Sequence, residues 1–301
     1  MSILGLVAMT ASSLSAVTAM FGTHNLIAFG DVSLSKEFYG PAYIEGSLTL
    51  TQSMQFGGGP YQIPKTDAIM SVQNGIYAGS NWINLNEGSI VSRNIPTQSL
   101  SINRNSGGSL ITGQAAWDHE REKLGLNPTD DLQDQFGDYA QSLANQATTA
   151  TKNFSDPNQY SITGDGSETS YITIEATDLQ KATGVNLNLN GSKTLVITVT
   201  GEGVYSFNFN SLGGVGKDVI WNFIGATSIN FNGSRFQGSI LAPNATVHTN
   251  GGSQGLVVVN NFTSNDELHE NPITAPTIPE PQSAGPLLLS FGILILIRKR
   301  R

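Results

Sequence analysis

Short apolar runs separated by turn residues constrain the fold more than any other feature of this sequence. Over residues 21–109, and again after Pro157, brief apolar or β-branched runs alternate with glycine, asparagine and serine. Charged side chains make up only 13% of the 301 residues, whereas there are 33 glycines. Runs this short suit strands better than helices, so the pattern predicts an all-β body with many turns.

Asparagines recur at a regular distance in the second half of the chain. They alternate with apolar residues in the segments 186–191, 207–210 and 229–233, and the steps from Asn188 to Asn208 and from Asn210 to Asn232 are 20 and 22 residues. One coil of a β-solenoid has about this length, and stacked coils can align Asn side chains in a ladder. We therefore predict a right-handed parallel β-solenoid. An antiparallel sandwich is the alternative, because it uses the same short strands.

One segment of the chain has helical rather than β character. Residues 115–124 and 129–152 are rich in helix-forming side chains, and Thr129 follows Pro128 at a suitable N-cap position. The sequence therefore predicts a helical insertion at about 115–152, with one long α-helix packed alongside the solenoid. Five apolar residues at helical spacing define the face that we expect to be buried: Leu132, Phe136, Tyr139, Leu143 and Ala147.

The N-terminus has the composition of an export signal. An apolar and small-residue run extends over residues 3–19, and Val17 and Ala19 are small enough for signal peptidase to accept them before a cut. We expect residues 1–19 to be a signal peptide cleaved after Ala19, so that the main domain spans residues 20–272. A buried first strand is the alternative interpretation of this run.

The C-terminus carries three features in a fixed order. A linker at residues 273–281 ends in Pro279, Glu280 and Pro281, and a hydrophobic segment with a basic tip occupies residues 282–301. This order resembles a PEP-CTERM sorting signal. The resemblance implies an exosortase as partner, transient anchoring in the inner membrane and export to the envelope or surface of a Gram-negative bacterium. An uncut membrane anchor is the alternative. The basic tip consists of Arg298, Lys299, Arg300 and Arg301.

Two blocks, one near each end of the main domain, resemble the choice-of-anchor A family. The first contains Gly30 and Asp31, and the second has the order Phe-Gln-Gly-Ser-Ile-Leu-Ala-Pro at residues 236–243. The resemblance implies an exported adhesive domain of β-solenoid type without catalytic residues. The remaining positions of the family pattern are Gly238, Ala242, Pro243, Glu267 and His269.

Composition excludes several functions. The net charge of -8 argues against nucleic acid as a partner, and the absence of cysteine excludes thiol nucleophiles and thiolate metal sites. Ser253 has the spacing of a hydrolase nucleophile, but an apolar strand follows it where a helix is required. We therefore predict a non-enzyme without a resident metal. A Ca²⁺ ion on the acidic surface, and a lyase or hydrolase on the same scaffold, stay open as alternatives.

Aromatic residues in the turn-rich first half are candidates for carbohydrate contact, since flat sugar sites use exposed rings. They are Tyr61, Tyr77 and Trp82, whereas Trp117 and Trp221 lie in periodic segments and are expected in the core. That all three tryptophans are packing residues is the alternative. We expect an adhesin-like surface or matrix protein that contacts polysaccharide or other surface proteins. Ice binding is less favoured, because it needs a regular threonine array and only residues 198–200 suggest one.

Overall fold

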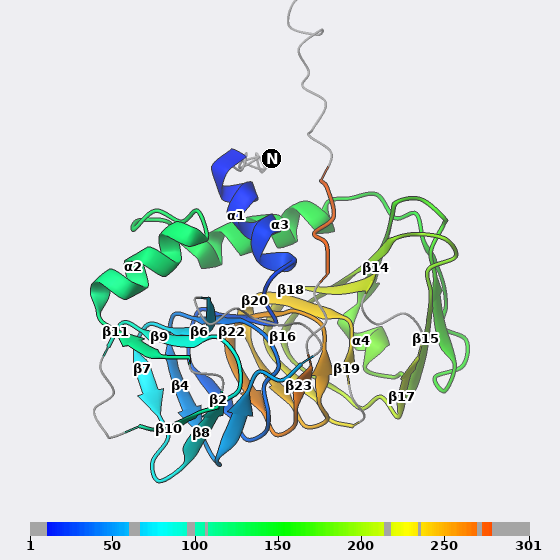
Figure 1. Cartoon of the computed structure of the whole chain (residues 1–301). Coiled ribbons are helices and arrows are strands. Elements are labelled where there is room, and N and C mark those ends of the chain that lie inside the picture. Colours follow the sequence, from blue (N-terminus) through cyan, green and yellow to red (C-terminus); the bar gives the residue numbers. More distant parts are fainter. Residues whose placement is uncertain are drawn as a thin grey trace, which may run out of the picture.

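Parallel strands stacked in coils form the body of the protein (Figure 1). The computed structural model describes residues 11–59, 67–94, 100–105, 108–213, 218–233, 236–269 and 273–278. Within these residues only β12 (Thr151–Asn153) and β13 (Tyr160–Thr163) pair in antiparallel fashion. The predicted all-β class with parallel, solenoid-like coils is therefore confirmed, and the antiparallel sandwich is wrong. The hand of the coil stays a prediction.

The coils have three faces. The first, which we call the helix-covered face, contains one row of parallel strands. In spatial order these strands are β11 (Leu110–Thr112), β9 (Ser89–Ser92), β6 (Ala68–Val72), β3 (Ala42–Ile44), β1 (Leu26–Ala28), and the first parts of β22 (Val257–Ser264), β20 (Ser239–Thr249), β18 (Val219–Phe231) and β16 (Thr194–Phe207), followed by β14 (Thr169–Glu175).

The second face, which we call the polar face, continues from the same coils after a bend. Its strands are β7 (Gly75–Tyr77), β4 (Ser47–Leu50), β2 (Val32–Leu34) and the second parts of β22, β20, β18 and β16. Register shifts at the bends in β16, β18 and β20 mark where these long strands pass from one face to the next.

The third face is built from shorter strands. Phe38 joins two groups of them, because it forms one bridge to Phe56 and another to Leu268. The groups are β10 (Ser101–Arg104), β8 (Trp82–Leu85) and β5 (Met54–Phe56) on one side, and β23 (Leu268–His269), β21 (Ser253–Gln254) and β19 (Phe236–Gln237) on the other. Beside β19 lie β17 (Ser211–Gly213), β15 (Gly184–Asn188) and the β12–β13 pair.

The order of the coils in space differs from their order in the chain. Strand β1 pairs with β3 on one side and, on the other, with β22, which lies near the opposite end of the domain in sequence. The chain therefore starts in the middle of the solenoid, coils toward β11, crosses to the far end through its helices, and coils back. Where β22 begins, the side chains of residues 256–259 are all fully buried.

Coil length varies, so the asparagines of the three periodic segments do not all lie opposite one another. Asn186 of β15 lies opposite Gly213, and not opposite an asparagine of the next segment. Phe207 lies opposite Phe231, and Phe231 lies opposite Thr249, so the second of these coils is shorter than the first. The apparent period indicated a solenoid correctly, but corners of unequal length shift which residues become neighbours.

The insertion contains two helices rather than the one long helix predicted for about 115–152. Helix α2 (Gln114–Lys123) ends before Gly125, whose φ of 73° breaks the helix, and α3 (Leu132–Ala144) follows. The N-cap of α3 is Asp131 rather than Thr129, because the Asp131 carboxylate accepts a hydrogen bond of 3.0 Å from Asp134 N–H. The other helices within the described residues are α1 (Ala11–Phe21) and the single-turn α4 (Ala176–Leu179).

The helices cover one face of the solenoid and create a second core (Figure 1). Four of the five predicted helix residues are buried in this core, whereas Ala147 lies beyond the end of α3 and is exposed. The inner strands of the helix-covered face are therefore buried on both sides, which explains why β1, β3 and β9 are buried without alternation, whereas the outer strands β11 and β14 are partly exposed. The side chains that these strands contribute to the second core are Ile27, Tyr43, Val196, Ile220, Leu241 and Val258.

A buried arginine fastens α2 to the sheet. Arg121 Nη1 lies 3.0 Å from Tyr43 Oη and 3.2 Å from Glu45 Oε1, and Nη2 donates to the backbone oxygens of Asn127 and Asp130. These contacts neutralise a charge that would otherwise be costly to bury. They also fix the loop between α2 and α3.

Helix α1 packs into the second core. Val17, Met20 and Phe21 are fully buried, and the Phe21 ring lies 6.0 Å from that of Phe136 and 5.3 Å from that of Tyr139. The expected cleavage site after Ala19 therefore falls within a packed helix. Among the described residues no helix is long and apolar enough to cross a membrane. The predicted sorting signal lies outside the described residues.

Truncation tests the contribution of α1. A chain starting at Met20 lacks Val17, and full burial of a valine contributes about 1.5–3 kcal/mol. Compared with a chain starting at Ala11, we expect the free energy of unfolding to fall by roughly 2 kcal/mol, measured by urea denaturation. Equal midpoints would show that the first turns of α1 do not stabilise the domain, and that cleavage after Ala19 leaves it intact.

Stability should depend on pH through His24, which follows α1. Burial lowers the pKa of His24 to about 4. In the unfolded chain the pKa is near 6.5, so the unfolded state binds more protons between these values. Stability should therefore be full above pH 6.5 and fall toward pH 4, by at most about 3 kcal/mol. His24→Gln should remove this slope, and subtracting the two urea-denaturation profiles cancels the carboxyl groups that both proteins share. Parallel profiles would contradict the assignment.

Candidate functional site

Two straight rows of mainly polar side chains cross the polar face. Strand register aligns the first row across seven coils, and the second lies two residues earlier on the same strands. The first row contains Ser206, Asn230, His248, Thr263, Ser33, Thr49 and Tyr77. The second contains Val204, Ser228, Thr246, Asn261, Asp31 and Ser47.

The rows are regular because each coil contributes one residue at the strand spacing of about 4.8 Å. Backbone and side chains connect neighbouring coils: Asp31 N–H donates to Asn261 Oδ1 at 2.7 Å, and Ser47 N–H donates to Asp31 Oδ1 at 2.8 Å. The polar face is therefore an ordered array of hydroxyl and amide groups.

An asparagine ladder runs along the edge of the polar face. Asn265 Nδ2 donates to Asn250 Oδ1 at 2.9 Å, and Asn250 Nδ2 donates to Asn232 Oδ1 at 3.0 Å. His248 Nε2 lies 2.9 Å from the same Asn250 oxygen. A ladder along an edge was expected from the sequence, but Asn250 and Asn265 were not among its expected members.

The aromatic candidates occupy different places. Tyr77 is 44% exposed at the end of a row on the polar face, and Trp82 is 47% exposed on the third face. Residues 78–81 form the corner between them. Trp117 and Trp221 are buried, as expected, so only the alternative of three packing tryptophans is wrong. Tyr61 lies outside the described residues.

A hollow of about 320 Å³ opens beside Trp82. It collects residues from four regions of the chain, three in the first third and one close to the end of the domain. We call it the Trp82 hollow, and it is lined by Ser35, Lys36, Glu37, Gln52, Ser53, Met54, Gln55, Trp82, Asn84 and Glu267.

Hydrogen bonds hold the acidic side of the Trp82 hollow in place. The Glu37 carboxylate accepts from Tyr39 Oη and, at 2.6 Å, from Gln55 Nε2, and these donors lower the pKa of Glu37. The same bond to Glu37 raises the pKa of Tyr39 to about 12. His269 stacks on the Tyr39 ring and lies 3.0 Å from Glu267. Of the family-pattern residues, Glu267 thus lines this hollow, and His269 contacts both Glu267 and Tyr39.

The glycines and the proline of the family pattern shape corners. A Cβ on Gly30 would lie 2.3 Å from Asn261 Oδ1, and one on Gly238, where φ is 105°, would lie 2.9 Å from Trp221 Nε1. Side chains therefore cannot fit between these coils. Ala242 and Pro243 are buried in β20.

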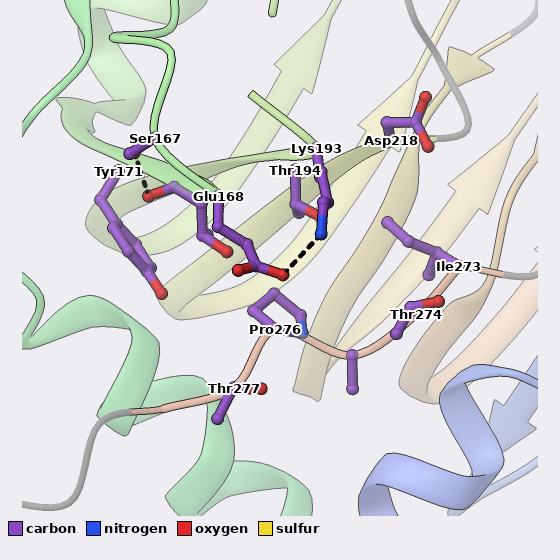
Figure 2. Close-up of a pocket in the computed structure, with 12 residues that line it drawn as sticks. Ser167, Glu168, Tyr171, Lys193, Thr194, Asp218, Ile273, Thr274, Pro276 and Thr277 are labelled. Carbon is purple, nitrogen blue, oxygen red and sulfur yellow. Dashed lines mark hydrogen bonds and ion pairs between the residues drawn. The ribbon is translucent and has the colours of Figure 1, made fainter. Parts of the chain in front are cut away.

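A larger cleft of about 860 Å³ lies under the C-terminal segment 273–278 (Figure 2). Glu168 and Lys193 point toward one another across it at 2.9 Å, while Asp218 lies apart at the other end. The segment is held by a hydrogen bond of 3.0 Å from the buried Tyr139 Oη to Pro276 O. Of the two carboxylates that line this cleft, Glu168 is paired with a lysine and Asp218 lies away from that pair.

The hydrolase-like pattern does not assemble. Ser253 is buried and its Oγ has no hydrogen-bond partner, while Asp266 accepts from Gly252 N–H and His269 lies beside Glu267. Within the described part of the chain, no group of three or more His, Asp or Glu residues is placed to hold a metal ion. The calcium alternative stays a prediction.

Sequence reasoning missed the polar rows and most of the Trp82 hollow. Each row takes one residue from each coil, and Glu37, Gln55 and Asn84 were not singled out at all. The only signal in the sequence was alternation within short strands, where Gln55 stands between the buried Met54 and Phe56. That pattern shows which residues face outward but not which strands become neighbours.

A family model described as "Putative Ice-binding-like adhesive domain" (pAdhesive_15) matches residues 17–270. This chain belongs to that family. The family supports an adhesive-like, non-enzymatic domain of an extracellular or surface protein. The match begins at residue 17, within α1. The choice-of-anchor A and PEP-CTERM resemblances stay predictions, and no curated protein matches the sequence.

Several solved ice-binding proteins resemble this adhesive domain weakly. One from an Antarctic biological consortium shares 15% identity, covering 90% of this chain and 94% of that one, with a TM-score of 0.32. LeIBP from an Arctic yeast shares 13%, covering 90% and 99%, with a TM-score of 0.37. A domain of Shewanella frigidimarina ice-binding protein 1 shares 13%, covering 86% and 97%, with a TM-score of 0.33. At these sequence identities and TM-scores, the ligands of the solved proteins say nothing about what this chain binds.

The asparagine ladder predicts a graded loss of stability. Asn250→Ala removes the donor to Asn232 and the acceptor used by Asn265, whereas Asn265→Ala removes only one of these bonds. We expect Asn250→Ala to lower the free energy of unfolding by about 1 kcal/mol and Asn265→Ala by roughly half as much, measured by urea denaturation. Equal effects would show that the ladder bonds do not contribute separately.

Proposed function

We propose that this chain is an exported adhesive domain that binds an extended, hydroxyl-rich polymer, a polysaccharide, along its polar face. The observation that carries the proposal is the pair of aligned rows, the first with seven residues and the second with six, on neighbouring parallel coils. Each group contributes a weak hydrogen bond, and a polymer that engages many of them at once gains affinity from multivalency.

The chemistry of the rows suits hydroxyl groups better than charged groups. Asp31 is the one carboxylate among the row residues, and its Oδ1 already accepts from Ser47 N–H. The other row residues are mainly Ser, Thr and Asn, which can donate and accept hydrogen bonds. A neutral polymer with a repeating pattern of hydroxyls matches this surface.

Ice binding is the second candidate function, favoured by the flat regular rows and by the family description. Three observations place it second. Tyr77 and Val204 project from the rows as large exposed side chains, Asp31 adds a charge, and His248 interrupts the first row. The threonine stretch at residues 198–200 does not supply an exposed ice-binding array, because Thr198 is buried under α3. Thr198 lies beside Asn222, whose side chain donates a hydrogen bond to Ala140 O of α3.

The proposed location is the surface or matrix of a Gram-negative cell, reached by export and exosortase sorting. The supporting features are those of the two chain ends, which lie largely outside the described residues. Intact mass of protein extracted from the envelope tests the sorting step. A C-terminus near Pro281 supports cleavage, whereas a C-terminus at Arg301 contradicts it.

Co-sedimentation with the producing organism's exopolysaccharide tests the adhesive function. The double variant Thr49→Glu/Thr263→Glu places two charges in the first row, and Thr151→Glu/Thr173→Glu places the same charge on exposed strands elsewhere. We expect the first to weaken binding at least tenfold and the second to bind like the unmodified protein. Release of reducing ends, measured in the same tubes, should stay at background.

Three results would contradict this proposal. Equal binding by both double variants would show that the polar face is not the surface used. New reducing ends would make the protein an enzyme. Absence of polysaccharide binding, together with thermal hysteresis that Thr49→Glu/Thr263→Glu abolishes, would favour the ice-binding alternative.

A further inference from the structure

We infer that the Trp82 hollow on the third face is a subsite for one or two rings of a neutral or amino sugar, and that it rejects uronic acids. The inference deepens the proposed function, on which it rests, by naming a second contact and its sugar class. It stands on the exposed tryptophan, the shape of the hollow and the fixed polar groups beside it.

Trp82 is available for stacking. Its side chain is 47% exposed, while the other two tryptophans are buried in the two cores. Its backbone is fixed by pairing of β8 with β5 and β10, and its N–H donates to Ser53 Oγ at 3.1 Å. A rigid strand thus presents a large aromatic side chain to solvent. Such a ring can pack against the apolar face of a sugar at small entropic cost.

A row of polar groups lies next to Trp82 along the coils. Gln55 is opposite Asn84, and it donates at 2.6 Å to Glu37 on the neighbouring coil, which also lies beside Leu268. Gln55 Oε1 in turn accepts from Asn86 Nδ2 at 3.0 Å. These contacts fix the orientation of the amides and the carboxylate before any ligand arrives. Preorganised groups of this kind lose little freedom on binding.

Acceptors predominate at the hollow. Each Glu37 oxygen already takes one donor but has a further lone pair, and Glu267 is about one-third exposed. Asn84 Oδ1 accepts no hydrogen bond within the described residues but is buried, so it adds no acceptor on the open side of the hollow. Hydroxyl groups and a protonated sugar amine are donors, so they match this side of the hollow.

The negative charge of the hollow disfavours binding of acidic sugars. Among the residues that line the hollow, Glu37 and Glu267 face a single cation, Lys36, which lies 3.7 Å from Asp266. Hydrogen bonds from Tyr39 and Gln55 lower the pKa of Glu37, which keeps it ionised at neutral pH. A uronate would therefore bring a third carboxylate near two others, and like charges at this distance repel.

Size sets the number of rings. The hollow measures about 320 Å³, which is at the small end of ligand pockets, roughly 300–1,000 Å³. One or two sugar rings fit in this volume, so the subsite would contact a short unit of a polymer. The polar face supplies many weak contacts, and the Trp82 hollow supplies selectivity for the sugar unit.

Oligosaccharide titration of the full chain tests the inference. The probes are pentamers of β-linked glucose, of glucosamine and of a uronic acid, followed by isothermal calorimetry and tryptophan fluorescence. Trp82→Ala removes the stacking surface, and Trp82→Phe keeps part of it. Ile111→Ala is the matched control, because Ile111 is similarly exposed, at 44%, but lies on β11, outside both the hollow and the rows of the polar face. Circular dichroism checks that each variant is folded.

We expect the glucose and glucosamine pentamers to bind with a blue shift of emission, and the uronic acid pentamer to bind at least tenfold more weakly. Trp82→Ala should weaken binding at least tenfold, Trp82→Phe less, and Ile111→Ala not at all. Glu37→Gln should narrow the difference between the neutral and the uronic acid pentamers.

The outcomes separate this inference from the proposed function. If Trp82→Ala leaves pentamer affinity unchanged, or if the uronic acid pentamer binds equally well, the subsite is overturned, even where Thr49→Glu/Thr263→Glu still abolishes polymer binding. If pentamers bind through Trp82 while the polar-face variants bind polymer normally, the subsite stands and the proposed role of the polar face is wrong.

Discussion

The pairing of β1 with β22 is the contact on which the rest of the structure depends. Residues 26–28 and 257–259 form adjacent parallel strands whose side chains are fully buried. This pair joins two stacks of coils, one from the first third of the chain and one from the second half, into one continuous row. Without it, each stack would expose an apolar sheet edge with unpaired backbone groups, which is costly in water and invites aggregation.

The helices follow from the same arrangement. Because the first stack ends at β11 and the second begins at β14, the chain must cross the length of the solenoid between them, and α2 and α3 make that crossing over one face. Their apolar sides pack against strands that are consequently buried on both surfaces. The other two faces stay open, so the groups available for binding are confined to them.

Local features of the fold could be predicted from the sequence, whereas long-range register could not. The helical spacing of Leu132, Phe136 and Tyr139 depends only on neighbouring turns, and these residues are buried as expected. The break between α2 and α3 was missed, because Gly125 with φ of 73° and the Asp131 cap outweigh the helix-forming residues around them. The sequence could not predict which residues form the rows of the polar face, because Asn230, His248 and Thr263 follow one another at unequal steps along the chain. Likewise, Glu37 and Glu267 meet only because Phe38 bridges to Leu268.

The central position of the first coil has a consequence for folding. Strand β1 can pair with β3 as soon as both exist, but its other edge stays open until residues 257–264 are available. Contacts between such distant segments require a large loop closure, and proteins rich in them fold slowly. The last coil therefore completes the domain only after residues 257–264 have been made. A chain with this folding order remains incompletely folded during synthesis, which is the condition that passage through a narrow translocation channel requires.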